Sequence, residues 1–251
     1  MNHIVFVPGF LTSQTCSSIG DTYRAIYTYA LEHHFPFWYV PLPNNNYGDL
    51  GNTTVEDCLD TVIHRYNELC ASVGAEDTIL LIGHSMGGLL VSRMMTDTYH
   101  TRLTRLPDLV RLLNPALRTH TSWTSALLGT VLSFLPETVL GTILTPVTIA
   151  GRNMLYPGSP AFAPSMKPLL AVSLQRRTGG LLLGNETWDL TPAAALRERI
   201  ALVHCEADPV ASCAGTDAHA TLHHLPMTRV ASPYHEYFDA HLLGILFGTI
   251  A

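Results

Sequence analysis

Short apolar runs alternate with longer amphipathic stretches along most of the chain. The apolar runs predict buried strands over residues 4–7, 37–40, 78–82, 109–113, 200–205 and 222–230. Apolar residues at helical spacing predict helices over residues 21–33, from 53 or 54 to about 73, over 86–98 and over 236–246. Strands that alternate with helices favour an α/β fold, in which a mostly parallel sheet is covered by helices on both faces.

The alternation stops between residues 117 and 195, where Leu, Thr, Pro and Gly predominate. Charged residues are sparse from 119 to 175. Because strand patterns return further along the chain, we expect residues 117–195 to form a helical cap, inserted into a core made of residues 1–116 and 196–251. Prolines interrupt the most apolar stretch, residues 122–150, so it does not predict a membrane-spanning helix.

The composition is that of an apolar globular protein rather than a disordered one. The length of 251 residues is enough for one large α/β domain, and 47% hydrophobic with only 14% charged residues is an apolar composition that can form a core. The net charge is −6 with 14 Lys and Arg residues, so no nucleic-acid-binding surface is expected. Cys205 and Cys213 are predicted to be free thiols. The odd number of cysteines, 5, and a first strand without a preceding leader favour a reducing, cytoplasmic location.

Residues 83–87 read Gly-His-Ser-Met-Gly, between a predicted buried strand and a predicted helix. This pattern is typical of a nucleophile elbow, a sharp turn that presents a serine at the edge of a sheet. Gly83 and Gly87 suit such a turn because side chains there would clash with the neighbouring strands. A plain strand–turn–helix is the alternative interpretation of the same five residues. His84 is interpreted as a packing or polar residue.

A nucleophilic serine needs a base to remove its proton and an acid to orient that base. Asp208 follows the predicted strand 200–205, and His235 follows the predicted strand 222–230. Because the carboxyl ends of parallel strands meet at one edge of a sheet, we expect both residues at the edge that holds Ser85. The alternatives are Glu206 and Asp217 for the acid, and His219, His223, His224 and His241 for the base.

With these motifs, the chain resembles the α/β-hydrolase superfamily, in particular its small lipases and esterases. The resemblance covers residues 4–115 and 200–251, which is nearly all of the chain except the expected cap. The order of serine, acid and histidine along the chain is that of this superfamily. The resemblance implies that Ser85 is the nucleophile, His235 the general base and acid, and Asp208 the carboxylate that orients the histidine.

The resemblance also implies an oxyanion hole made of the backbone N–H groups of Phe10 and Met86. Phe10 follows a turn that reads Val-Pro-Gly, with proline where the superfamily often has histidine. No cofactor is implied, and no metal site is expected. His219, His223 and His224 are close in sequence, but no carboxylates or thiolates are seen to converge with them, so they are interpreted as surface residues.

These features predict a serine esterase or lipase that acts on an uncharged, apolar ester with a medium or long acyl chain. Apolar residues of the expected cap would line the acyl-binding cleft and make transient contact with a lipid interface, or would only build core. The alternatives are a thioesterase or acyltransferase with the same triad, a carbon–carbon or amide hydrolase, and a hydrolase-fold ligand-binding protein with little turnover. The sequence leaves the oligomeric state open.

Overall fold

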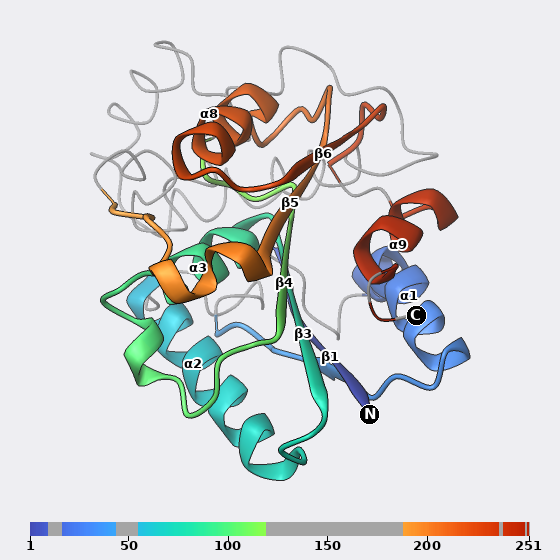
Figure 1. The fold of residues 1–251 in the computed structure, drawn as a ribbon. Helices are drawn as coiled ribbons and strands as arrows, with labels where there is room; N and C mark the ends of the chain where they lie inside the picture. The colour runs from blue at the N-terminus through green and yellow to red at the C-terminus, as the bar shows by residue number, and fades with distance from the viewer. Residues whose placement is uncertain (10–16, 44–54, 119–187, 236–237, 249, 251) are drawn as a thin grey trace, which may run out of the picture.

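Six parallel strands form one sheet in the order β2-β1-β3-β4-β5-β6 (Figure 1). The computed structural model describes residues 1–9, 17–43, 55–118, 188–235, 238–248 and 250. The strands are β1 (Asn2–Val7), β2 (Phe37–Tyr39), β3 (Thr78–His84), β4 (Leu109–Leu113), β5 (Ile200–Cys205) and β6 (Met227–Val230). The helices of the described residues are α1 (Ser17–Glu32), α2 (Val55–Ser72), α3 (Met86–Met94), α8 (Cys213–His223), α9 (Ala240–Phe247) and the short 3₁₀ helices η1 (His100–Arg102) and η3 (Ala194–Arg199). The predicted α/β architecture is confirmed.

β3 lies inside the sheet and has buried side chains on both faces. Ile79 and Leu81 pack in one core cluster with residues of α2 and α3. Leu80 and Ile82 pack in a second cluster with residues of α1 and α9. Figure 1 shows these two layers of helices on either side of the sheet. Successive side chains of a strand face opposite sides, so a strand that is covered on both faces needs a continuous apolar run.

The carboxyl ends of the strands lie at one edge of the sheet because all strands run in the same direction. β1 and β3 are in register there, with Val7 opposite Gly83. The loops after β5 and β6 begin at the same edge, where the N–H of Ala207 donates to the carbonyl oxygen of Ser232 at 3.2 Å. This edge therefore collects the residues that directly follow each of the six strands.

The strand predicted over residues 222–230 is wrong in its first half. α8 extends to His223, and β6 comprises only Met227–Val230. The hydroxyl of Ser212 caps the start of α8 by accepting a backbone N–H at 3.1 Å. His224 ends the helix in the left-handed region, with φ 57°. Over so few residues, the end of an amphipathic helix and the start of a strand give similar apolar patterns.

Two further helices are shorter than predicted. α3 ends at Met94, and Thr96 then forms an isolated antiparallel bridge with Pro192. α9 begins at Ala240, after the side chain of Asp239 has capped its first turn by accepting a backbone N–H at 2.8 Å. In both cases a tertiary contact or a cap, rather than the apolar spacing, sets the boundary of the helix.

Most of the expected cap, residues 119–187, lies outside the described residues. Where the description resumes, Leu190 and Ala193 are buried in the cluster that covers the α2 and α3 face. The N–H of Ala193 donates to the carbonyl oxygen of Met95 at 2.9 Å, which joins this segment to the end of α3. None of the helices in the described part of the chain is long and apolar enough to cross a bilayer.

Leu81→Ala tests the buried face of β3, because Leu81 is fully buried. We expect the free energy of unfolding to fall by about 2–5 kcal/mol, from lost apolar burial and the cavity that remains. Leu31→Ala is the matched control, since Leu31 is 60% exposed, and should change it by less than about 0.5 kcal/mol. Urea denaturation followed by circular dichroism measures both, and equal losses would contradict this assignment of the core.

Candidate active site

Ser85 joins β3 to α3 in a sharp, strained turn, with φ 55° and ψ −119°. A positive φ is uncommon for a residue that carries a Cβ. A Cβ on Gly87 would lie 2.2 Å from the carbonyl oxygen of Val7, and one on Gly83 would lie 2.7 Å from the carbonyl oxygen of Gly87. Glycine is therefore required at both positions, and the turn has the shape predicted from the sequence.

The backbone of Ser85 is held by the segment that follows β4. Its N–H donates to the carbonyl oxygen of Leu113 at 3.0 Å, and its own carbonyl oxygen accepts the N–H of Ala116 at 2.9 Å. Both backbone polar groups are thus bonded outside the turn itself. These bonds keep the residue in its strained conformation and fix the direction of its side chain.

The structure brings Ser85, His235 and Asp208 together in one hydrogen-bonded chain. His235 Nε2 lies 2.8 Å from Ser85 Oγ, and His235 Nδ1 lies 2.6 Å from Asp208 Oδ2. All three residues are buried. A carboxylate only accepts hydrogen bonds, so the proton of the neutral imidazole sits on Nδ1. Nε2 is then an acceptor, and the hydroxyl of Ser85 donates to it.

Asp208 is held by its second oxygen. Oδ1 accepts the N–H groups of Val210 at 2.7 Å and Ala211 at 3.0 Å. His204, buried beneath the loop, donates from Nε2 to the carbonyl oxygen of Ala211 at 3.3 Å. The loop after β5 therefore folds around the carboxylate, which leaves Oδ2 facing His235.

The alternative acids and bases lie elsewhere. Asp217 on α8 forms an ion pair at 2.8 Å with an arginine of β6, and Glu206 is exposed. His224 ends α8, and His241 is exposed on α9. As far as the described residues show, none of these side chains joins the Ser–His–Asp chain.

Two polar residues at this edge were missed by the sequence prediction. Asn114, which follows β4 with φ 42°, donates from Nδ2 to the carbonyl oxygen of His235 at 2.7 Å. Tyr23 of α1 bonds through its hydroxyl to His84 Nδ1 at 2.8 Å. The position of Asn114 directly after a predicted strand could have indicated a site residue. The position of Tyr23 could not, because its spacing is that of a core residue of an amphipathic helix.

Met86 is the first residue of α3, and its backbone N–H belongs to the first turn of that helix. The N–H groups of a first turn have no acceptor within the helix and carry the positive end of its dipole. This geometry suits a donor to a developing negative oxygen beside Ser85. Phe10, the other expected donor, lies outside the described residues.

A family model described as the alpha/beta hydrolase family matches residues 4–242. The chain belongs to the alpha/beta hydrolase family. The match spans nearly the whole sequence, so the predicted fold and the resemblance are both confirmed. No curated protein matches this hydrolase in sequence.

Solved structures support the same fold. The type II thioesterase BorB from the borrelidin biosynthetic cluster superposes with a TM-score of 0.59 at 16% identity, over 100% of this chain and 93% of that one. An esterase from Pyrococcus furiosus gives 0.57 at 12% identity, over 98% and 82%. A hydrolase from Oleispira antarctica gives 0.56 at 12% identity, over 100% and 91%. At sequence identities this low, the structural similarity establishes only the fold of this hydrolase.

The cysteine thiols near the site are not rivals to Ser85 as a nucleophile. Cys205 and Cys213 are free thiols, as predicted. Burial raises the pKa of Cys205 to about 11, so its thiol stays neutral near pH 7. Cys205 also accepts a hydrogen bond from Asn114 Nδ2 at 3.4 Å. It is a packing residue beneath the loops of the hydrolase.

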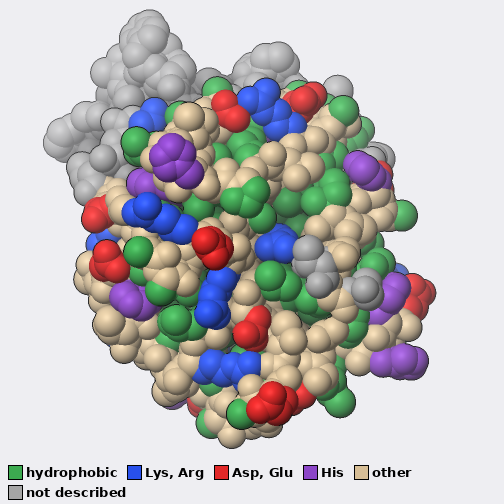
Figure 2. Space-filling view, viewed as in Figure 1, with side chains coloured by type: hydrophobic (Ala, Val, Ile, Leu, Met, Phe, Trp, Pro, Cys, Tyr) green, Lys and Arg blue, Asp and Glu red, His purple; other side chains and the backbone are tan. Residues whose placement is uncertain are grey.

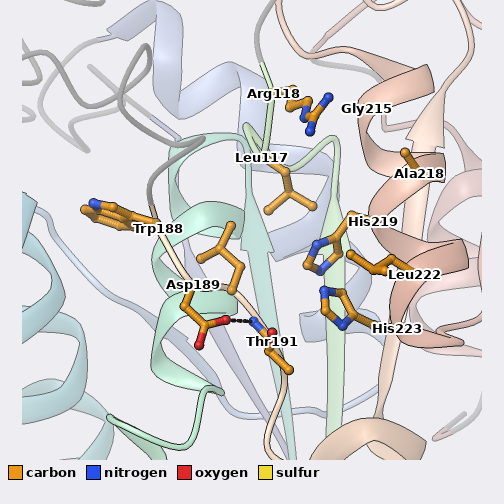
Figure 3. A pocket seen from close by; sticks show the side chains of 11 residues that line it. Leu117, Arg118, Trp188, Asp189, Thr191, Gly215, Ala218, His219, Leu222 and His223 are labelled. Atoms are coloured by element: carbon orange, nitrogen blue, oxygen red, sulfur yellow. Dashed lines mark hydrogen bonds between the residues drawn. The ribbon is translucent and has the colours of Figure 1, made fainter.

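An open cavity of about 310 Å³ lies beside α8 of this hydrolase (Figure 3). Its walls combine apolar, charged and imidazole side chains. The lining residues are Leu117, Arg118, Trp188, Asp189, Leu190, Thr191, Gly215, Ala218, His219, Leu222 and His223. Ser85, Asp208 and His235 are not among them, so the cavity is not lined by the Ser–His–Asp chain.

His219 and His223 lie one turn apart on α8 and line this cavity. Their ring centroids are 4.5 Å apart, and burial is the main reason that the pKa of His219 falls from 6.5 to about 4. His219 is half-buried and lines an open cavity, so it is less exposed than the interpretation as a surface residue implies. The described part of the chain contains no group of three or more side chains that suits a metal ion.

Charges of both signs are interspersed over the face shown in Figure 2, where basic side chains lie next to acidic ones. Among the described residues, basic and acidic side chains form ion pairs, such as Arg229 with Asp217 at 2.8 Å and Arg102 with Asp60 at 2.8 Å. The described residues visible on this face therefore form no broad cationic patch.

Gly87→Ala tests the close approach of the elbow to β1. The new Cβ would meet the backbone of Val7, so we expect the free energy of unfolding to fall by at least about 1–3 kcal/mol. Gly244→Ala on α9 is the matched control, because a Cβ there meets nothing within 4 Å; it should be neutral or stabilising by up to about 1 kcal/mol. Urea denaturation compares the two variants. Equal stabilities of the two variants would contradict the close contact between Gly87 and the backbone of Val7.

The burial of His219 predicts acid sensitivity. Below pH 6.5 the unfolded chain takes up a proton that the folded hydrolase binds only near pH 4, so stability is lost as the pH falls through this window. When the pH is lowered from 7 to 5, we expect the free energy of unfolding of the wild type to fall by about 2 kcal/mol more than that of His219→Gln. Exposed His241 provides the control variant, His241→Gln. A wild-type pH dependence in His219→Gln would contradict the expectation.

Proposed function

We propose that this chain is a serine hydrolase that cleaves carboxylic esters through an acyl-enzyme. The observation that supports the proposal is the hydrogen-bonded chain from Ser85 Oγ through His235 to Asp208, at 2.8 Å and 2.6 Å. A nucleophile, a base and an acid in this order form the triad of serine hydrolases. The fold and the family are consistent with that chemistry.

In the proposed reaction, Ser85 Oγ attacks the carbonyl carbon of the ester while His235 Nε2 takes the hydroxyl proton. Asp208, which is bonded to Nδ1, stabilises the imidazolium that forms. The tetrahedral intermediate collapses as the C–O bond to the alcohol breaks, and His235 returns the proton to the alcohol. The same histidine then removes a proton from water, whose oxygen attacks the acyl-Ser85 ester. As the bond from the acyl carbon to Ser85 Oγ breaks and the acid leaves, His235 returns the proton to Ser85 Oγ.

The negative oxygen of the tetrahedral intermediate needs donors. We propose the backbone N–H groups of Met86 and Phe10 for this role. The position of Met86 at the start of α3 supports the first; the second rests on the family resemblance. Loss of one such donor typically lowers the rate by about 10²- to 10³-fold.

For the substrate, we propose an uncharged ester with a medium or long apolar acyl chain. The support is the sequence of the expected cap, which carries few charges between residues 119 and 175. A thioester is the alternative acyl donor, since the same three residues would attack it, and BorB, a thioesterase, shares this fold. The choice between the two lies in the pocket rather than in the triad.

Covalent labelling with a fluorophosphonate probe tests the proposed nucleophile. Intact-mass measurement should show one adduct on the wild type and none on Ser85→Ala, because the probe reacts only with an activated serine. The control is Ser92→Ala, on α3, whose hydroxyl donates to a helix carbonyl and not to a histidine; it should label like the wild type. A folded wild-type protein without an adduct would contradict the proposal and favour a ligand-binding role.

Turnover of p-nitrophenyl esters and of acyl-coenzyme A thioesters, each over a range of acyl lengths, tests the proposed substrate. We expect kcat/KM for the esters to rise with acyl length up to a medium or long chain, because apolar burial favours binding by about 0.8 kcal/mol per methylene. Faster turnover of the thioesters would replace the ester proposal with the thioester one. Ser85→Ala should abolish either activity.

A further inference from the structure

The backbone carbonyl oxygen of His235 accepts two hydrogen bonds from side chains. Asn114 Nδ2 lies 2.7 Å from it, and His84 Nε2 lies 3.1 Å from it. Both donors are buried. A carbonyl oxygen has two lone pairs, so both are used. His235 is thus held from behind by two residues while its ring bonds Ser85 and Asp208 in front.

These contacts determine how the ring of His84 is protonated. A carbonyl oxygen can only accept, so the Nε2 of His84 carries a proton. In the neutral imidazole, Nδ1 is then an acceptor, and the hydroxyl of Tyr23 donates to it at 2.8 Å. The oxygen of Tyr23 accepts the N–H of Gly9 at 3.1 Å. Every hydrogen bond from Gly9 to His235 therefore has a defined direction.

The ring of His84 has little freedom to leave this position. It is 1% exposed and lies edge-on to the rings of Tyr23 and Phe238, with centroids 5.6 Å away in each case. Its centroid is 5.0 Å from that of the His235 ring. Packing and hydrogen bonds thus agree on one orientation of the ring, which is what a positioning residue requires.

We propose that Tyr23 and His84 are positioning residues that hold His235 in hydrogen-bonding distance of Ser85. This proposal rests on the function proposed above, because it assigns the relay from Gly9 through Tyr23 and His84 a role in keeping the base in place. The relay also joins two parts of the site. It starts in the turn after β1, next to the expected oxyanion donor, and it ends on the backbone of the expected general base.

Asn114 also donates to the carbonyl oxygen of His235, but it makes further hydrogen bonds within the sheet. Its Oδ1 accepts the N–H of Cys205 at 2.7 Å, and its own N–H donates to the carbonyl oxygen of Val203 at 2.9 Å. It therefore joins the ends of β4 and β5. A variant of Asn114 would change the sheet as well as the site, so His84 and Tyr23 are the residues to test.

A pair of variants at position 84 separates the donor bond from the packing. In His84→Gln, the side-chain amide can place an N–H close to the position of Nε2 and keep the bond to His235. In His84→Asn, the amide reaches only the position of Nδ1, so the bond to Tyr23 can persist and the bond to His235 is lost. Both variants replace the imidazole ring by an amide, so both lose the ring contacts with Tyr23 and Phe238.

We expect His84→Asn to lower the rate constant of fluorophosphonate labelling by about 10- to 100-fold, because a small displacement of a catalytic group has effects of this size. His84→Gln should recover the rate to within about threefold of the wild type. Thermal unfolding of both variants is measured alongside. Equal rates in the two variants, or a wild-type rate in His84→Asn, would overturn the proposal, since a purely structural role would not distinguish the two amides.

Tyr23→Phe is the second variant, in case the changes at position 84 prevent folding. It keeps the ring contacts with Phe6 and Phe238 and removes only the hydroxyl between Gly9 and His84. We expect kcat and the labelling rate to fall by about 3- to 10-fold, within the range for a lost neutral hydrogen bond, with KM little changed. Tyr29→Phe, also on α1, is the control and should behave like the wild type. A wild-type kcat in Tyr23→Phe would remove Tyr23 from the relay.

One measurement separates failure of this proposal from failure of the proposed function. The proton between His235 Nδ1 and Asp208 should give a downfield proton signal in the nuclear magnetic resonance spectrum, and this signal does not depend on turnover. We expect it to persist in His84→Gln and to broaden in His84→Asn through exchange with water. If the wild type neither labels nor hydrolyses esters, the proposed function fails, and this signal still decides whether His84 holds His235. An unchanged signal in His84→Asn would overturn the proposal.

Discussion

Gly87 lies so close to the end of β1 that a Cβ would come within 2.2 Å of the carbonyl oxygen of Val7. This contact lets α3 begin directly at the sheet edge, with its first-turn N–H groups beside the strand end. The chain can make that connection only through a sharp turn, so Ser85 adopts φ 55°. The strain is held by bonds from the Ser85 backbone to the segment after β4. These backbone constraints determine where the serine side chain leaves the turn, and the hydrogen bond to His235 then holds its hydroxyl.

Hydrogen-bond direction organises the rest of the edge. Asp208 can only accept, and this places the proton of His235 on Nδ1 and leaves Nε2 free to accept from Ser85. The backbone carbonyl oxygen of His235 can also only accept a hydrogen bond. It therefore places the proton of His84 on Nε2. Two imidazoles in contact thus carry their protons on different nitrogens, each chosen by a neighbour that cannot donate. Buried polar groups of this kind specify one arrangement when each has its partner.

The loops after β5 and β6 carry the acid and the base, Asp208 and His235. Their backbones are joined by the hydrogen bond from the N–H of Ala207 to the carbonyl oxygen of Ser232, which fixes the loop of the acid against the loop of the base. Asn114, between them and the elbow, joins the ends of β4 and β5. The cavity beside α8 is lined by none of these residues and carries a half-buried imidazole of its own, His219. The lowered pKa of His219 comes mainly from its burial beside α8 and not from any contact with the triad.

Local rules determined much of this protein from sequence. Continuous apolar runs predicted the parallel sheet because strands covered on both faces need them, and the glycine spacing around Ser85 predicted the elbow. The positions of Asp208 and His235 followed from strand ends meeting at one edge. Tertiary structure alone decided the partners of Tyr23, Asn114 and His84, which lie 61, 121 and 151 residues along the chain from the groups they bind. It also decided where α8 ends and β6 begins, since a cap and burial set that boundary. A hydrogen bond between distant residues leaves no local pattern, because it depends on how strands and helices pack and not on the spacing of side chains within them.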